Sequence, residues 1–166
     1  EYFSKDVCIN SLVLYDVYGP FDARGKLVNV LLNSAVTKTP VNLTPGDQLL
    51  DYVHIDDVVR AFELTGLSHL SRANERQTKF CRSTVRSMEV RKLKEFVKIL
   101  GQVVGYTPNV RWGEKPYPDN QIMNPWFPSE KFQLTGWQPK HTFFSGLKSI
   151  LKYESNKTND LHSKLQ

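Results

Sequence analysis

The sequence lacks the features that define several large classes of protein. No apolar run approaches the roughly 18 residues of a membrane-spanning helix, so we predict no membrane span. The opening residues, EYFSKD, have neither the basic start nor the apolar core of a signal peptide. The two cysteines, Cys8 and Cys81, lie far apart and without metal-type spacing. We therefore predict a cytoplasmic protein with reduced thiols and no metal site.

The sequence also has no long stretch in which charges of one sign are concentrated. The 22 Lys and Arg residues outnumber the 17 Asp and Glu residues, which gives a net charge of +5, but the basic residues are scattered. The one modest cluster, at 86–98, alternates with apolar residues at helical spacing. This pattern favours a solvated helix face over a phosphate-binding stripe, and we predict no nucleic-acid partner.

Segments typical of strands and helices alternate along the chain, which predicts the α/β class. The apolar runs predict strands at 8–19, 39–43, 49–55, 78–83 and 109–112. Helical spacing predicts helices at 25–37, 56–70, 87–104 and 145–155. Asp56 is predicted to cap the second of these helices. Residues 1–5 are predicted to be the last turn of a further helix. The run Leu12–Tyr15 is continuously apolar, which is typical of a strand covered on both faces in a parallel sheet.

An ordered series of short motifs resembles the extended short-chain dehydrogenase/reductases. The series is YGP at 18–20, GKL at 25–27, GDQLLDYVHIDDV at 46–58, GWQP at 136–139 and GL at 146–147. It is similar to the second half of the NAD-dependent nucleotide-sugar epimerases and dehydratases, which include CDP- and dTDP-linked deoxysugar enzymes of O-antigen and polysaccharide biosynthesis. The resemblance implies the C-terminal portion of a Rossmann-like fold with its small substrate-binding α/β subdomain. Residues 1–155 would form this substrate-binding half, and 156–166 a polar tail.

The resemblance also implies parts that this sequence does not contain. Such enzymes use NAD or NADP, bound at a glycine-rich turn, and a catalytic Tyr-x-x-x-Lys pair for transient hydride transfer at the sugar C4. The sequence has no GxxGxxG or GxGxxG, and Tyr2 and Lys5 stand three residues apart rather than four. We therefore assign no catalytic residue and expect the isolated chain not to transfer hydride. The implied partners are a nucleotide-diphosphate sugar and either the missing N-terminal half or a homodimer partner.

Seven residues match positions that bind ligands in this family. By resemblance, Leu14 and Tyr18 approach the cofactor, and the substrate-binding residues are Asp16, Lys26, Leu27, Gln48 and Arg111. Structural roles stay open for three of them: Asp16 as a turn cap, Tyr18 as a packed aromatic, and Lys26 as a solvated surface side chain. We interpret His54 as architecture rather than a catalytic base. Trp137 is predicted to pack the C-terminal helix onto the body.

Two departures from the family pattern bear on phosphate binding. Leu50 and Pro118 stand where many relatives carry arginine, and neither can hold a diphosphate. Arg111 is a candidate substitute for that arginine. The losses favour a different nucleotide, a different mode of binding, or weakened binding. A non-catalytic remnant or binding module of the same fold therefore remains the alternative to a working substrate domain.

Overall fold

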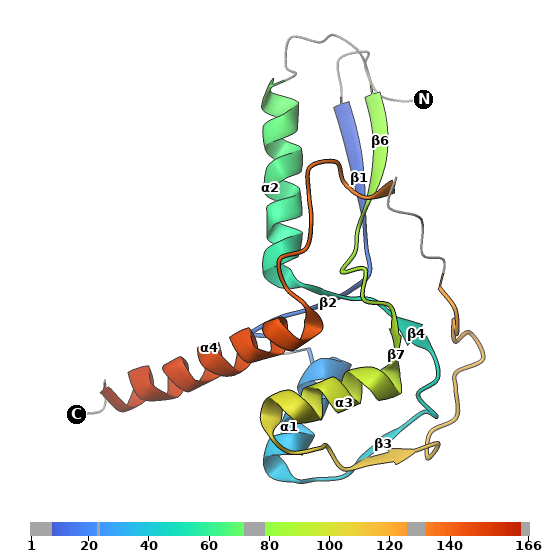
Figure 1. The fold of residues 1–166 in the computed structure, drawn as a ribbon, viewed down its shortest axis with the longest axis vertical. Coiled ribbons are helices and arrows are strands. Elements are labelled where there is room, and N and C mark those ends of the chain that lie inside the picture. The colour runs from blue at the N-terminus through green and yellow to red at the C-terminus, as the bar shows by residue number, and fades with distance from the viewer. Residues whose placement is uncertain (1–7, 23, 72–78, 126–131, 164–166) are drawn as a thin grey trace.

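The computed structural model describes residues 8–22, 24–71, 79–125 and 132–163 (Figure 1). Eight strands and four helices alternate along the described chain. Their order is β1 (Cys8–Leu14), β2 (Asp16–Tyr18), α1 (Leu27–Thr37), β3 (Val41–Leu43), β4 (Leu49–Leu50), β5 (Tyr52–His54), α2 (Ile55–Ser71), β6 (Lys79–Val85), β7 (Arg91–Lys92), α3 (Leu93–Val104), β8 (Val110–Trp112) and α4 (Phe143–Ser163). Within these ranges, no helix is long and apolar enough to cross a membrane.

The strands associate in four pairs rather than in one broad sheet. The pairs β1–β6, β2–β5 and β3–β8 are parallel, and β4–β7 is antiparallel. Parallel strands connected through helices confirm the α/β prediction. In Figure 1 the long β1–β6 pair lies beside α2 at one end of the molecule, and α1, α3, β3 and β8 form the other end.

The first strand is less covered than its apolar sequence predicts. The described side chains of β1 from Ile9 to Val13 are half-buried, and Leu14 is 38% exposed. Among the described residues, α2 packs against β1, and β6 is its paired strand. A continuously apolar strand that is covered this sparsely leaves one edge of the sheet able to accept a further strand.

The main core lies between α1, α3 and α4 and fixes the two tyrosines of the candidate site. Phe143 of α4 contacts Phe96 of α3 with ring centroids 4.7 Å apart. Tyr18 packs on Phe143 at 5.1 Å, and Tyr52 packs edge-on against Phe96 at 4.9 Å. Because these rings interlock and are buried, the ends of β2 and β5 are held against the helical core.

A second, smaller core fastens α2 to the segment before α4. Val58 and Ala61 of α2 pack with Val53, Val85 and Trp137 in this cluster. The Trp137 indole N–H also donates to the backbone oxygen of Asp57 at 2.9 Å. Trp137 is therefore a packing residue as predicted, but it packs against α2 and β6, whereas we predicted contact with the C-terminal helix.

Several element boundaries differ from the sequence-based predictions. The predicted strands at 8–19 and 49–55 are each interrupted, at Tyr15 and at Asp51. The predicted helix at 87–104 begins at Leu93, because the Ser87 backbone N–H and hydroxyl donate to Asp51 and Met88 adopts a left-handed φ of 66°. A pattern of apolar spacing does not detect such tertiary hydrogen bonds.

The helix ends also differ from their predicted positions. Helix α2 begins at Ile55, so Asp56 lies in its first turn rather than at the cap. Helix α4 begins at Phe143 and reaches Ser163, so the expected polar tail is helical over 156–163. The helix end predicted at 1–5 lies outside the described residues.

Candidate substrate-binding site

A small cavity of about 220 Å³ opens between β2, β5 and the first turn of α1. Its lining, which we call the Asp16 cavity, consists of Asp16, Val17, Tyr18, Asp22, Lys26, Leu27, Val28, Asn29 and Tyr52. Four of the seven predicted ligand-binding residues therefore meet in one place. The volume is below the roughly 300 Å³ at which pockets for whole ligands begin, so the cavity suits one ring of a longer molecule.

The other three predicted residues do not line this cavity. Leu14 ends β1 and is partly exposed there. Gln48 is buried, and its amide contacts the hydroxyls of Thr44 and Tyr117 at 3.5 and 3.3 Å. Arg111 is exposed on β8 and does not line the Asp16 cavity.

The first strand-to-helix connection brings both Asp16 and Lys26 to the cavity. Asp16 begins β2, whereas Lys26 immediately precedes α1, with a turn between them. This turn is pinned by Asp22, whose carboxylate accepts bonds from Arg24 Nε at 2.7 Å and Nη2 at 3.0 Å. The Asn29 side-chain amide donates to the Asp22 backbone oxygen, which ties the turn to α1.

Tyr52 is a cavity residue that sequence analysis missed. It pairs with Asp16 in the parallel register of β2 and β5, and it is 7% exposed. Its hydroxyl makes no hydrogen bond within the described residues, although the ring lines the cavity. Burial raises the pKa of Tyr52 and the nearby Asp16 carboxylate adds to that shift, so the phenol stays protonated and able to donate. The apolar run around it predicted a strand, but no sequence signal marked its hydroxyl.

Asp16 is also unpartnered, although its surroundings are charged. Its carboxylate makes neither a hydrogen bond nor an ion pair within the described residues. The surrounding protein removes part of its hydration, which raises its pKa; Lys26 opposes the shift and Asp51 adds to it. Within the described part of the chain, a carboxylate, an ammonium and a phenol thus line one small cavity without partners of their own, which is the composition of a site for a polar ligand.

Tyr18, in contrast, is committed to packing. It is 4% exposed, and its hydroxyl donates to the backbone oxygens of Thr142 and Phe143, each at 3.4 Å. Burial raises its pKa, with Glu89 and Asp57 contributing, so the phenol does not ionise at neutral pH. Of the two roles left open for Tyr18, the geometry favours the packed aromatic that supports the cavity floor.

A buried ion pair lies behind the cavity and supports β5. The Asp51 carboxylate accepts hydrogen bonds from Arg86 Nε at 3.1 Å and from Ser87 at 2.8 and 2.7 Å. The Arg86 guanidinium also stacks over the Tyr15 ring at 5.6 Å. Because all of these contacts join residues 35 or more positions apart, the cluster sets how β2 and β5 face each other.

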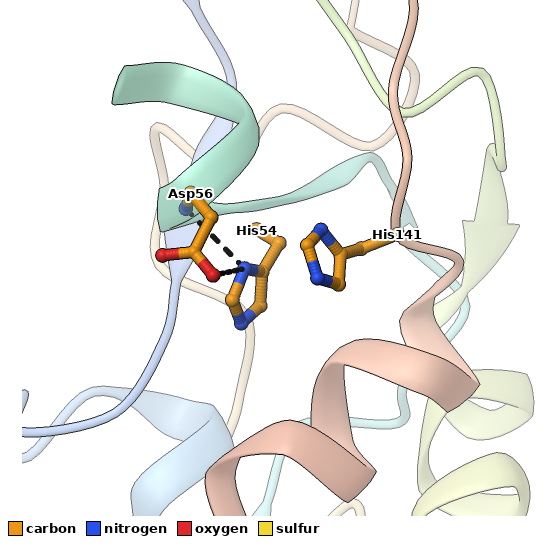
Figure 2. A group of neighbouring side chains, drawn as sticks. All are labelled: His54, Asp56 and His141. Carbon is orange, nitrogen blue, oxygen red and sulfur yellow. Dashed lines mark hydrogen bonds and ion pairs between the residues drawn. The ribbon is translucent and has the colours of Figure 1, made fainter. Parts of the chain in front are cut away.

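His54, Asp56 and His141 form a cluster whose residue types could bind a metal (Figure 2). The Ser149 hydroxyl donates to the Gly146 backbone oxygen, so the His54 Nε2–H donates to Ser149 at 3.0 Å. His54 Nδ1 then accepts the backbone N–H of Asp56 at 3.3 Å and caps α2. Both ring nitrogens of His54 are therefore already engaged.

The two imidazoles are also arranged unfavourably for a shared metal ion. Their planes are nearly parallel, at 28°, and their centroids are 4.2 Å apart. A metal lies in the plane of each imidazole that binds it, and stacked rings cannot both direct a nitrogen at one ion. His141 Nδ1 is moreover bonded to Asp57 at 3.2 Å. The cluster therefore serves as a structural junction, which agrees with the architectural interpretation of His54.

This junction predicts a stability change with pH. Burial, followed by His141, lowers the pKa of His54, so the unfolded chain binds a proton more readily than the folded one. The free energy of unfolding should therefore decrease as pH falls below the unfolded value near 6.5, by at most about 1.4 kcal/mol per pH unit. Urea unfolding of wild type and His54→Asn at pH 7.5 and 5.5 measures this, because asparagine keeps a capping acceptor but does not titrate. An equal pH dependence in both proteins would contradict the assignment.

Comparisons with known proteins agree with the motif series. Residues 3–77 match the model of the NAD dependent epimerase/dehydratase family. CDP-abequose synthase from Salmonella typhimurium is 27% identical over 150 residues, which cover 89% of this chain and 48% of that enzyme. The N-terminal part of the chain is thus similar to the NAD-dependent epimerase/dehydratase family, and the similarity to CDP-abequose synthase extends over most of the chain. The CDP-abequose synthase of Yersinia pseudotuberculosis is 39% identical over 62 residues, covering 37% of this chain and 22% of the relative.

Solved structures show the same fold. MoeE5 in complex with UDP-glucuronic acid and NAD matches with a TM-score of 0.72 at 20% identity, over 89% of this chain and 47% of MoeE5. MoeE5 has also been solved with UDP-glucose and NAD, and that structure matches equally well. The match confirms the Rossmann-like, extended short-chain dehydrogenase/reductase fold. The chain spans about half the length of MoeE5 and at most about half that of the two CDP-abequose synthases.

The described residues do not form a dinucleotide site of the family type. The turn from β5 into α2 is unsuited to a pyrophosphate, because Asp56 and Asp57 place two carboxylates in the first turn of the helix. The sequence also has no glycine-rich turn. No step of hydride transfer can therefore be derived from these residues, and the chemistry that they support is ligand binding.

Proposed function

We propose that this chain is part of an NAD-dependent epimerase/dehydratase and binds a nucleotide-diphosphate sugar at the Asp16 cavity. It would be the substrate-binding part of an epimerase, dehydratase or reductase that uses NAD or NADP at the sugar C4 in a longer polypeptide. The similarity to CDP-abequose synthases supports a CDP-linked deoxysugar of O-antigen biosynthesis as the substrate. Residues 1–155 form this part in the proposal, and they do not transfer hydride by themselves.

One observation carries the proposal: three polar groups that have no partner among the described residues line a cavity that fits a single ring. The carboxylate of Asp16 can accept bonds from ligand hydroxyls, and the Tyr52 phenol can donate or accept. The exposed ammonium of Lys26 lies at the rim, where it can approach a phosphate. Lys26 and Leu27 also occupy the family positions that approach the nucleotide.

The open edge of β1 supports a partner as well. A two-stranded parallel pair with one covering helix is marginal alone, and further strands normally cover such a sheet. We propose that the other half of the enzyme, or a second copy of the chain, pairs with this edge. The nucleotide sugar would then be held next to the cofactor that the other half binds.

Calorimetric titration with CDP-glucose tests the proposed binding site. The wild-type chain should bind, and Tyr52→Phe should weaken binding about threefold to tenfold, because the substitution removes one neutral hydrogen bond worth about 0.5–1.5 kcal/mol. Removing this hydroxyl should leave the fold intact, because it makes no hydrogen bond to any residue that the structure describes.

The matched control is Tyr106→Phe, which removes a phenol that is 40% exposed and does not line the cavity. It should bind like wild type. If the wild-type chain does not bind CDP-glucose or UDP-glucose at millimolar concentration, the result favours the non-catalytic remnant. Binding that is insensitive to Tyr52→Phe would place the ligand elsewhere.

A further inference from the structure

The charges around the Asp16 cavity are unevenly compensated. Asp22 is paired with Arg24 at 2.7 Å, and Asp51 is paired with Arg86 at 3.1 Å. Asp16 has no such partner among the described residues. Of the three carboxylates near the cavity, it is the one whose charge is not balanced by a bonded guanidinium.

Lys26 does not cancel this charge inside the cavity. Its side chain is exposed and makes no ion pair within the described residues, so solvent screens its ammonium. Asp16 is also exposed, but it stands beside the buried Tyr52 in the strand register, and both residues line the cavity. A ligand group that enters between them meets a carboxylate and a phenol, and the cation stays at the rim.

We infer that Asp16 is a specificity residue that makes the cavity select an uncharged, hydroxyl-bearing sugar ring and reject a ring that carries a carboxylate. The inference rests on the proposed function. A carboxylate accepts hydrogen bonds from sugar hydroxyls, and charge-assisted bonds of this kind are stronger than neutral ones. A second carboxylate in the same small cavity is repelled by Asp16, because like charges at short range repel each other even where solvent screens part of the interaction.

Solved structures with the same fold contain both a neutral and an acidic sugar. MoeE5 has been solved both with UDP-glucose and with UDP-glucuronic acid, so the same fold accommodates a neutral and an acidic sugar. Discrimination between the two sugars must therefore come from individual side chains of the cavity. Asp16 is the side chain in this chain that is chemically suited to impose it.

The test compares UDP-glucose with UDP-glucuronic acid, which share a nucleotide and differ in the C6 group of the sugar. Dissociation constants are measured by calorimetry for the full chain, for Asp16→Asn, and for Asp119→Asn as the matched control. Asp119 is an exposed carboxylate outside the cavity, so its substitution makes the same change in net charge. Wild type and Asp119→Asn should both prefer UDP-glucose at least tenfold.

Asp16→Asn should reduce that preference below threefold, chiefly because UDP-glucuronic acid binds more tightly. The preference of the wild type should also decrease at high salt, as expected for repulsion between charges. Equal affinity of the wild type for both sugars, or a preference that Asp16→Asn leaves unchanged, would overturn the inference while the proposed function stands. Failure of both UDP-sugars to bind while CDP-glucose binds would overturn the inference alone, and failure of all three to bind would contradict the proposed function as well.

Discussion

Replacing Asp57 by alanine should lower the free energy of unfolding by about 3–5 kcal/mol, the usual cost of breaking a buried charged pair by removing one partner. Its carboxylate is fully buried and accepts four hydrogen bonds. The donors are Arg60 Nη1 at 2.6 Å, the backbone N–H groups of Lys140 and His141 at 2.9 Å each, and His141 Nδ1 at 3.2 Å. Without the carboxylate, these donors lose their acceptor inside the protein. Urea unfolding followed by circular dichroism measures the loss.

The neighbouring residue provides a matched control. Asp56 also lies in the first turn of α2, but its side chain is half exposed and makes one long contact, 3.5 Å, to His54 Nδ1. Asp56→Ala should therefore cost about 0.3–1 kcal/mol, the contribution of an exposed acid at a helix N-terminus. If the two substitutions have equal effects, the segment before α4 does not depend on Asp57.

The order of motifs predicted much of the candidate site. The YGP turn places Asp16 and Tyr18, and the GKL segment places Lys26 and Leu27, at the end of one strand and the start of the next helix. Such a connection is short, so its residues meet locally and can be predicted from the sequence. The four residues do line one cavity.

The parts that sequence analysis missed depend on contacts between distant segments. Tyr52 reaches the cavity because β5 pairs with β2, and nothing within its own segment indicates that pairing. The late start of α3 has the same cause, because Asp51 holds Ser87 out of a helical conformation. Gln48 and Arg111 were assigned by position in the family pattern, and tertiary structure places them away from the cavity.

The apolar run in β1 is typical of a covered strand, and the described residues cover it only in part. An apolar run indicates that a strand is meant to be covered, but it does not indicate which polypeptide segment covers it. Within the described residues, α2 packs on the β1–β6 pair, and Leu14 remains partly exposed. The mismatch between sequence and coverage is the physical basis for the proposed partner at this edge.

Adding one methyl group to α4 should test how tightly this helix packs against Tyr18, which lines the Asp16 cavity. Gly146 lies in α4, where a Cβ would overlap the Tyr18 hydroxyl oxygen and lie 2.9 Å from His54 Cδ2. Neither neighbour can move freely, because Tyr18 is bonded to the backbone before α4 and His54 to Ser149. Gly146→Ala should therefore lower the free energy of unfolding by about 1–3 kcal/mol, the range for overpacked cores.

Helix propensity alone predicts that replacing a helical glycine by alanine raises the free energy of unfolding. Substitution of a second glycine measures this propensity effect without the steric overlap. Gly66 lies in α2, and a Cβ there would meet nothing within 4 Å. Gly66→Ala should stabilise the protein by about 0.5–1 kcal/mol, since alanine is favoured over glycine in a helix. Urea unfolding of both variants at pH 7.5 compares them directly. If Gly146→Ala is stabilised as much as Gly66→Ala, α4 can shift away from Tyr18, and the YGP turn is not held by the close approach of that helix.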